Sequence, residues 1–373
     1  MSDDIYKKLR DYLDTFPLGF PSTASGVEMK ILRRLFTETE AALELLLTPI
    51  PETPESIARR AGRPVDEIAP GLEQMAKKGL IFRTRNKNDV KYNSTPFMIG
   101  IYEYSVSKID EDLAALYRQY YEEAYQKEMG ASNVPGFKVF PVGKTIQGEI
   151  ALLPYKKVED EIRAARKIAV APCICRKEAK LTGHDCRHSQ ETCLSFGVAA
   201  EYYIDNGFGR EIDADEAIGI LKQCDDEGLV HAGVNARHLS NICNCCACCC
   251  ASLKGIAEKN HDRLKYINAL YLAVVDPDGC TGCGSCEERC PVGAVEVDVC
   301  ARINERKCLG CGLCATGCPE AAIGIHLRED RAEPFDRVMD LGKAILLGKE
   351  QHVGLSENQK TTLELLKLLR PDQ

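Results

Sequence analysis

Residues 280–291 read CTGCGSCEERCP, and residues 308–319 read CLGCGLCATGCP. Both segments have the spacing Cys-x2-Cys-x2-Cys-x3-Cys-Pro, and the separation between the two copies is the same at every motif position. The flanks also repeat, because apolar runs precede and follow each loop. The sequence therefore predicts an internal duplication in which each half forms a strand, a cysteine loop, a short helix and a strand.

The spacing within each loop suits an iron–sulfur cube. Three thiolates on one short loop reach three corners of a cube, and glycines such as Gly282 and Gly310 permit the unusual backbone angles. The fourth thiolate, which precedes proline, is expected to bind the other cube. The predicted ligands are Cys280, Cys283, Cys286 and Cys318 for one [4Fe–4S] cluster and Cys308, Cys311, Cys314 and Cys290 for the second. Zinc is the alternative, but zinc sites want two separated Cys-x2-Cys pairs.

At all eight motif cysteines and at both prolines, residues 272–327 resemble bacterial two-cluster ferredoxins. The resemblance implies one-electron transfer between two cubes, and it identifies neither donor nor acceptor. The arrangement of the chain beyond these residues resembles ferredoxin-domain proteins of anaerobes.

The chain of 373 residues holds twenty cysteines, all between Cys173 and Cys318. The start MSDDIYKKLR has no apolar signal segment, and the best apolar run, ALYLAVV (269–275), is too short to span a membrane. We therefore expect a cytoplasmic protein whose cysteines bind metal rather than form disulfides. The formal net charge of −8 argues against nucleic acid or anionic membranes as partners.

Ten further cysteines lie in two segments upstream of the loops. NICNCCACCC (241–250) holds six of them, and APCICRKEAKLTGHDCRHSQETCLSFG (171–197) holds four. Basic neighbours such as Arg176 and His188 would lower the pKa of these thiols, which favours metal ligation or redox chemistry. The candidate ligands, of which we expect a subset to bind, are Cys173, Cys175, Cys186, Cys193, Cys243, Cys245, Cys246, Cys248, Cys249 and Cys250.

If residues 243–250 are helical, thiols three or four positions apart share a face and point in two directions. The thiols expected to share a face are Cys245 with Cys248 and Cys249, and Cys246 with Cys249 and Cys250. One direction would complete a site with Cys186 and Cys193, and the other would face the ferredoxin region. We predict at least one further iron–sulfur cluster, with zinc as the main alternative and a reactive dithiol or persulfide relay as a third. The CCG motif of heterodisulfide reductases is absent, so we do not expect the chain to have their chemistry.

Neighbouring elements place the other thiols. A strand at 166–172 should deliver Cys173, and Cys193 should begin a helix. Cys224 falls in an expected helix (213–228) and Cys300 on an expected strand. Both are interpreted as packed core thiols.

Residues 37–92 predict a helix, a helix–turn–helix and a two-stranded wing, and they resemble winged helix-turn-helix domains. The expected apolar face consists of Ile57, Ala58, Ala61, Val65, Ile68, Leu72, Met75 and Leu80. The second helix begins with Asp66 and Glu67, whereas recognition helices offer basic or amide side chains there. We therefore interpret this module as a protein-interaction platform, and its basic wing (RTRNKNDVK, 83–91) as solvated charge.

Residues 97–165 predict helices with a packed tyrosine stripe at Tyr117, Tyr120, Tyr121 and Tyr125. Gly143 and Lys144 lack the remaining glycines of a phosphate loop, and no Gly-x-Gly-x-x-Gly follows a strand. We therefore expect no nucleotide or flavin site. Two helical patterns after residue 335 should cap the protein or offer a homodimer surface, and the front module is the alternative homodimer surface.

The expected fold class is α+β with several domains. The predicted division is a winged helix-turn-helix-like module at 1–95, a helical or mixed connection at 96–165, a mixed α/β cysteine-rich domain at 166–270, a two-cluster ferredoxin domain at 271–330 and a helical tail at 331–373. The leading hypothesis is an electron carrier or an oxidoreductase subunit that docks a redox partner protein. The alternatives are an oxidoreductase with a substrate-reducing or partner-reducing site among the middle cysteines, and a redox-sensing transcriptional regulator.

Overall fold

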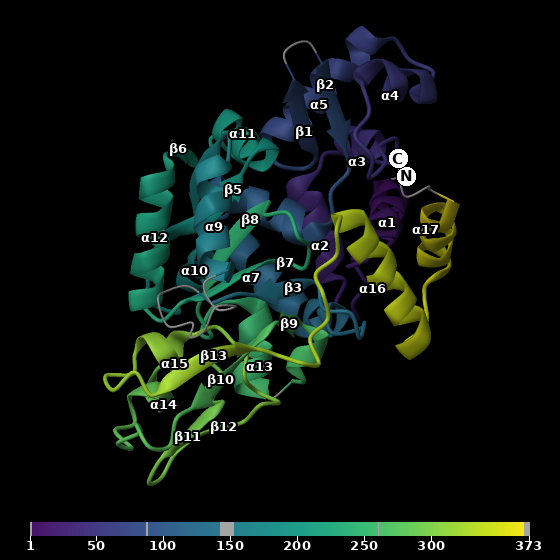
Figure 1. The fold of residues 1–373 in the computed structure, drawn as a ribbon. Helices are drawn as coiled ribbons and strands as arrows, with labels where there is room; N and C mark the ends of the chain where they lie inside the picture. Colours follow the sequence, from purple (N-terminus) through teal and green to yellow (C-terminus); the bar gives the residue numbers. More distant parts are fainter. Residues whose placement is uncertain (1, 87–88, 142–152, 260, 369–373) are drawn as a thin grey trace.

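The computed structural model describes residues 2–86, 89–141, 153–259 and 261–368. Helices and strands are mixed along this part of the chain, in agreement with the expected α+β class. In Figure 1 the front helices and a small sheet lie at one end, a larger sheet lies in the middle, and the cysteine loops of the repeat lie at the other end. One cluster of buried apolar side chains extends through all three regions.

Five helices and a hairpin form the front region. Their bounds are α1 (Ser2–Leu13), α2 (Val27–Leu35), α3 (Glu38–Glu44), α4 (Pro54–Ala61), α5 (Val65–Lys77), β1 (Phe82–Asn86) and β2 (Asp89–Asn93). Gly62 has a left-handed conformation (φ 62°) and separates α4 from α5, as expected for the turn. The expected apolar face is buried at Ile57, Leu72 and Met75, but Val65, the first residue of α5, is 38% exposed. The helix–turn–helix order is confirmed, while the winged-helix assignment stays a prediction.

The basic wing is not simply solvated, which corrects the expectation for two of its arginines. Arg83 binds Glu73 of α5 (2.8 Å) and Asp205 of α11 (Val198–Asp205; 3.1 Å). Arg85 binds the same two carboxylates at 2.9 and 3.0 Å. Asp205 is distant in sequence, so no local pattern could reveal this pairing. The two arginines join the front region to the middle region.

An aromatic cluster follows the hairpin. Its elements are η1 (Phe97–Ile101), α6 (Tyr102–Tyr104), η2 (Ser105–Ser107), α7 (Glu111–Tyr120), η3 (Tyr121–Tyr125) and α8 (Gln126–Met129). Tyr117, Tyr120 and Tyr125 are buried, and each ring contacts Phe97 with centroids less than 6 Å apart, at 5.7, 5.6 and 5.6 Å. These three tyrosines confirm the predicted packing stripe, whereas Tyr121 is only partly buried.

A seven-stranded sheet forms the middle region. Its strands, in spatial order, are β6 (Arg210–Ile212), β4 (Ile168–Pro172), β5 (Glu191–Phe196), β8 (Asn241–Cys245), β7 (Val230–Val234), β3 (Phe137–Val139) and β9 (Ile267–Ala269). Only the β3–β9 pair is parallel among these described strands. The associated helices are α9 (Leu153–Ala164), α10 (Ile174–Leu181), α11, α12 (Ala214–Asp226), α13 (Ala251–Lys259) and the short η4 (Arg263–Lys265). β3 therefore brings part of the connecting segment into this sheet, while Gly143 and Lys144 lie outside the described residues.

The duplicated loops sit on two small antiparallel sheets. The elements are β10 (Tyr271–Val275) paired with β13 (Ile323–Leu327), β11 (Val295–Val297) paired with β12 (Ala301–Ile303), and the helices α14 (Ser285–Glu288) and α15 (Leu313–Thr316). Arg289, directly after α14, donates to the carbonyl oxygens of Leu313 (2.9 Å) and of Asp225 at the end of α12 (2.8 Å). This side chain links the two halves of the repeat to the middle region.

The tail forms α16 (Val338–His352) and α17 (Glu357–Leu368) and returns to the front region (Figure 1). Lys349 of α16 is buried and pairs with Glu128 of α8. The predicted capping role of the tail agrees with this packing, and a homodimer through it stays a prediction. Within the described residues, no helix combines the length and apolarity needed to cross a membrane.

Candidate metal centres

Two cavities lie in the duplicated loops, and each brings together cysteines from both halves of the repeat. The cysteines lining the first cavity are Cys280, Cys283, Cys286 and Cys318. The cysteines lining the second cavity are Cys290, Cys308, Cys311 and Cys314. Each cavity therefore takes three thiols from one motif and the fourth, next to proline, from the other motif. The sequence analysis groups the same cysteines, and their role as cluster ligands stays a prediction.

Glycines let each loop close around its cavity. Gly310 has φ 66°, and a Cβ at this position would lie 2.1 Å from the carbonyl oxygen of Tyr271. Gly282 has φ 69°, and a Cβ there would lie 2.6 Å from the carbonyl oxygen of Val299. Both the dihedral angle and the close backbone approach require glycine.

Backbone N–H groups donate to the cysteine sulfurs. The N–H of Ala301 donates to Sγ of Cys280 (3.4 Å), and the N–H of Ala294 donates to Sγ of Cys290 (3.1 Å). The bond from Ala301 lowers the pKa of the Cys280 thiol, because it stabilises the thiolate. Four thiols, glycine-shaped loops and N–H donors to sulfur fit a [4Fe–4S] cluster in each cavity.

The two cavities differ in exposure. Cys283 of the first cavity is exposed, whereas Cys308, Cys311 and Cys314 of the second are buried. Burial raises the pKa of Cys314 to about 12, so this residue needs a bound metal to become a thiolate near neutral pH. The first cavity thus has one exposed cysteine, whereas three of the four cysteines of the second are buried.

The cysteine run at 241–250 forms a strand and a turn, so the shared faces worked out for a helical run do not apply. β8 ends at Cys245 and α13 begins at Ala251. β8 pairs with the preceding strand β7 and with the more distant β5, and these ladders override any local helical tendency. Because side chains alternate along a strand, Cys243 and Cys245 share one side and Asn244 takes the other. The run still presents thiols in two directions, but the cysteines that share a direction differ from those expected for a helix.

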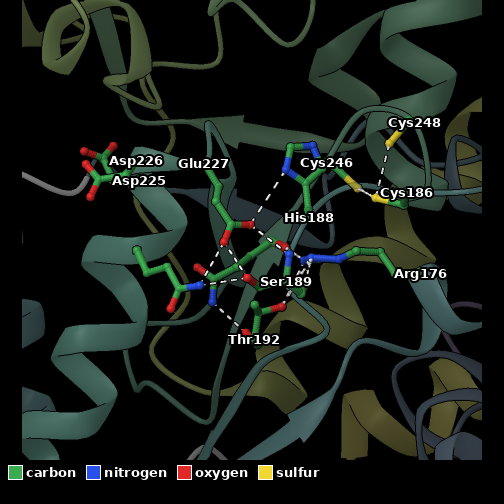
Figure 2. Close-up of polar contacts among 12 residues, drawn as sticks. Arg176, Cys186, His188, Ser189, Thr192, Asp225, Asp226, Glu227, Cys246 and Cys248 are labelled. Carbon is green, nitrogen blue, oxygen red and sulfur yellow. Dashed lines mark hydrogen bonds and ion pairs between the residues drawn. The ribbon is translucent and has the colours of Figure 1, made fainter.

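Four thiols form a compact cluster, the tight group, which consists of Cys186, Cys246, Cys248 and Cys249. Their four sulfur atoms all lie within 4.8 Å of one another. Sγ of Cys186 is 3.9 Å from that of Cys246 and 3.8 Å from that of Cys248, as Figure 2 shows. The sulfurs of Cys248 and Cys249 are 3.6 Å apart. Among the described residues, no other set of three or more Cys, His, Asp or Glu side chains is this compact.

The six remaining candidate thiols form a second cluster, the wide group, which consists of Cys173, Cys175, Cys193, Cys243, Cys245 and Cys250. The interacting thiol pairs are Cys173 with Cys175, Cys193 with Cys243, Cys243 with Cys245, and Cys245 with Cys250. Hydrogen bonds from Cys193 and Cys245 hold the pKa of Cys243 well below its ordinary value. In the part of the chain that the structure describes, no three of these sulfurs approach one another as closely as those of the tight group.

Arg176 lies between the two groups and is fully buried. Its guanidinium donates to Oγ1 of Thr192 (2.9 Å) and to the carbonyl oxygens of Ser189 (3.0 Å) and Asn244 (2.6 Å), all uncharged acceptors (Figure 2). Its Nε has no hydrogen-bond partner among the described residues. Burial alone would lower the pKa of Arg176, but neighbouring thiolates of both groups raise it. This cation is therefore placed to balance anionic sulfur on both sides.

Three other cysteine expectations have different outcomes. Cys193 lies on β5 and not at the start of a helix, because β5 pairs with β4 and β8. Cys224 is fully buried on α12 as predicted, where it packs against Cys246. Cys300 is only half-buried, and its thiol contacts that of Cys280, so the expectation of a core thiol is wrong.

Glu103 is a further candidate that the sequence did not reveal. Its carboxylate accepts a hydrogen bond from the N–H of Gly100 (2.8 Å). Loss of solvation, together with smaller contributions from the thiolates of Cys243 and Cys173, raises the pKa of Glu103 to about 8. Glu103 lies in the apolar stretch FMIGIYEYSV (97–106), where no motif marks an acid beside the wide group.

A family described as the 4Fe-4S binding domain matches this chain twice, at residues 273–296 and 301–324. The two matches cover the duplicated loops, which therefore form a ferredoxin-type domain. No curated protein and no solved structure matches the chain. The thiol groups of the middle region are thus interpreted from their geometry alone.

Proposed function

We propose that the chain is an electron-transfer protein whose two loop cavities hold two [4Fe–4S] clusters. The crossed origin of the cysteines carries the proposal, because each cavity combines three thiols of one motif with the fourth of the other. In this assignment Cys280, Cys283, Cys286 and Cys318 are the first ligand set, and Cys308, Cys311, Cys314 and Cys290 are the second. Such clusters, when bound, supply one-electron transfer at potentials set by hydrogen bonds and burial.

The surroundings of the cavities suggest different roles for them. Cys283 makes the first cavity the exposed one, so its rim is where we expect a redox partner protein to dock. Arg328, a buried residue beside the second cavity, donates to the carbonyl oxygens of Cys308 (3.2 Å) and Glu305 (2.7 Å). Its positive charge favours the more negative, reduced state of a centre held there.

The wide group is proposed to hold a further iron–sulfur cluster. Six half-buried thiols converge from β8, β5, the first turn of α10 and the residues directly before α10 and α13, and their sulfurs are spread more widely than a single ion requires. Arg176 offsets part of the negative charge that several thiolates would bring together. We therefore expect iron in excess of what two ferredoxin-type clusters contain.

An oxidoreductase site is a second candidate, because six thiols exceed the four corners of one cube. A cavity of about 170 Å³ is lined by Tyr121, Lys254 and one of the middle cysteines, Cys249, among others. Glu103, with its raised pKa, could donate a proton beside the wide group. Addition of cyanide to the reduced protein tests this candidate: an open iron position changes the spectrum of one cluster alone, and an unchanged spectrum argues against it.

DNA binding by the front module is not proposed. Arg83 and Arg85, the first two basic residues of the wing, are engaged by Glu73 and Asp205. A phosphate contact by either side chain would compete with two ion pairs.

The experiment measures iron and acid-labile sulfide per chain in protein purified without oxygen. We expect about twelve of each, and about eight would limit the clusters to the two loop cavities. Crossed ligation is tested with Cys290→Ala, Cys311→Ala and Cys283→Ala. Cys290→Ala should alter the same electron paramagnetic resonance signal as Cys311→Ala, although Cys290 belongs to the motif of Cys283. Cys300→Ala is the matched control and should retain both signals. If Cys290→Ala instead resembles Cys283→Ala, the ligand assignment fails.

A further inference from the structure

The tight group has the dimensions of a single-ion site. Zinc bound by four cysteines is tetrahedral with Zn–S bonds of about 2.3 Å, which places neighbouring sulfurs about 3.8 Å apart. Three of the six sulfur–sulfur separations in the tight group are 3.9, 3.8 and 3.6 Å, and all six are within 4.8 Å. The four sulfurs thus already lie close to the corners of a zinc tetrahedron.

From this geometry we propose that Cys186, Cys246, Cys248 and Cys249 bind one zinc ion in a closed, four-thiolate site. Four protein ligands leave no open coordination position, which is the hallmark of a structural rather than a catalytic zinc site. The site is separate from the iron–sulfur centres assigned to the loops and to the wide group.

An iron–sulfur cube does not suit these four thiols. In a cube each thiolate binds a different iron at an outer corner, so the sulfurs of the ligands are held well apart. The eight loop cysteines behave in this way, because within the described residues no three of them have sulfurs all within 4.8 Å of one another. A disulfide does not suit them either, since it requires two sulfurs at about 2.05 Å and would leave two thiols over.

Zinc here would hold together a loop and a turn that lie outside the β5–β8 ladder. Cys186 lies in the loop between α10 and β5, whereas Cys246, Cys248 and Cys249 form the turn between β8 and α13. The same loop is anchored to α12 by the N–H of Ser189, which donates to Glu227 (2.8 Å; Figure 2). Cys245 and Cys250 flank the turn on either side, so zinc would also fix the positions of two thiols of the wide group.

The surroundings can balance the charge of such a site. Zinc with four thiolates carries a net charge of −2, and the buried guanidinium of Arg176 is stabilised by thiolates that include those of Cys246 and Cys186. Cys224 packs against the group from α12 and contributes apolar contact. Arg176 therefore makes the tight group a suitable place for anionic sulfur inside the protein.

The test begins with the full-length protein, purified without oxygen and without chelators. Metal analysis should find about one zinc per chain beside the iron, and X-ray absorption at the zinc edge should find four sulfur neighbours at about 2.3 Å. A zinc-free protein, or zinc with nitrogen or oxygen neighbours, would overturn the proposal. A tetrathiolate iron site in place of zinc would overturn it as well, and the same spectrum recorded at the iron edge together with the zinc count identifies that case.

Variants then assign the ligands. Cys248→Ser should lower zinc from about one to less than about 0.2 per chain, while the iron of the two loop clusters is retained. Cys224→Ala, which alters a thiol that touches the group without belonging to it, is the matched control and should keep its zinc. Loss of about four irons with zinc unchanged in Cys248→Ser would show that the tight group holds a cluster, and the proposal would be wrong. The zinc count does not depend on the iron count, so this result is separable from the outcome for the electron-transfer function.

Discussion

The tight and wide groups draw their thiols from the same ten residues, yet they have different geometries. Cys246, Cys248 and Cys249 converge with Cys186 within 4.8 Å, whereas Cys243, Cys245 and Cys250 point to a larger and more dispersed set. The strand supplies the wide group through alternate side chains, and the turn that follows supplies the tight group. The comparison teaches that the separation of the sulfurs, and not the number of cysteines, indicates whether one ion or a cluster binds.

The largest expected effect comes from removing one thiol of the wide group. Cys193→Ala should lower the iron content by up to about four per chain, because a cluster that loses a ligand is destabilised, and zinc should stay near one. Parallel iron and zinc analysis of this variant and of the wild type provides the measurement. Equal loss of both metals would show that the two groups form one metal centre, and the distinction between the tight and the wide group would be wrong.

The next largest effect is expected from a glycine of the duplicated cysteine loops. We expect the backbone of these loops, and not the bound metal, to determine the loop conformation. Gly310→Ala should prevent correct folding of the second loop, because the new Cβ would meet the carbonyl oxygen of Tyr271 at 2.1 Å. Gly284→Ala is the matched control: φ is 83° there as well, but no atom lies within 4 Å of the new Cβ. We expect the control to cost only about 1–2 kcal/mol, the left-handed penalty. Chemical unfolding and the iron content of both variants test the difference, and similar values for the two would contradict it.

Replacing the cation between the groups tests whether their sulfurs are anionic. If thiolates surround Arg176, Arg176→Met should destabilise the protein by about 3–5 kcal/mol, because it leaves buried negative charge uncompensated. If the sulfurs are neutral thiols, the same change should be neutral or stabilising. Unfolding free energies of the metal-loaded protein decide between the two, and Arg176→Lys, which keeps the charge, should recover part of any loss.

The smallest effect is an acid sensitivity of β8, the strand beneath both groups. His231 on β7 is buried, its Nδ1 lies 2.5 Å from Oδ1 of Asn244 on β8, and burial lowers its pKa to about 4. Between its unfolded pKa of about 6.5 and 4 the unfolded chain binds a proton that the folded protein does not, so stability falls as the pH falls. Between pH 7 and pH 5 the loss should be about 2 kcal/mol.

Thermal unfolding of His231→Gln and of the exposed His238→Gln control provides the check. His231→Gln should flatten the dependence between pH 7 and pH 5, and the control should retain it. An equal slope in both variants would assign the acid sensitivity to other groups, such as the thiolate ligands themselves.

The loop cavities could be predicted from the sequence because their information is local. Spacing, proline and glycine define each motif. The duplication indicates that the fourth cysteine of each motif, Cys290 or Cys318, joins the three thiols of the other motif. The helix–turn–helix order was predictable for the same reason, since Gly62 and the apolar period lie within one short segment. Signals of this kind are reliable because the conformation of each segment is determined mainly by residues within the segment itself.

The middle region was predicted only in outline, because long-range pairing decides it. Whether the start of the cysteine run forms a helix or a strand depends on pairing with β7, the preceding strand, and with β5, which is distant in sequence. Cys193 was therefore grouped with Cys186 although it contacts Cys243. The pairing of Arg83 with Asp205 likewise has no signature in either segment, since each residue alone is typical of a solvated surface.

Arg289 has a consequence for the kinetics of electron transfer. Its guanidinium is held by the carbonyl oxygens of Asp225 and Leu313, so a cation caps the negative end of α12 and fastens the repeat to it. On the proposed function, we expect a ferredoxin-type domain fastened in this way not to act as a swinging carrier between a distant donor and acceptor. Internal electron transfer should then proceed at a rate that is independent of solvent viscosity, and only the docking of the partner should slow down in glycerol.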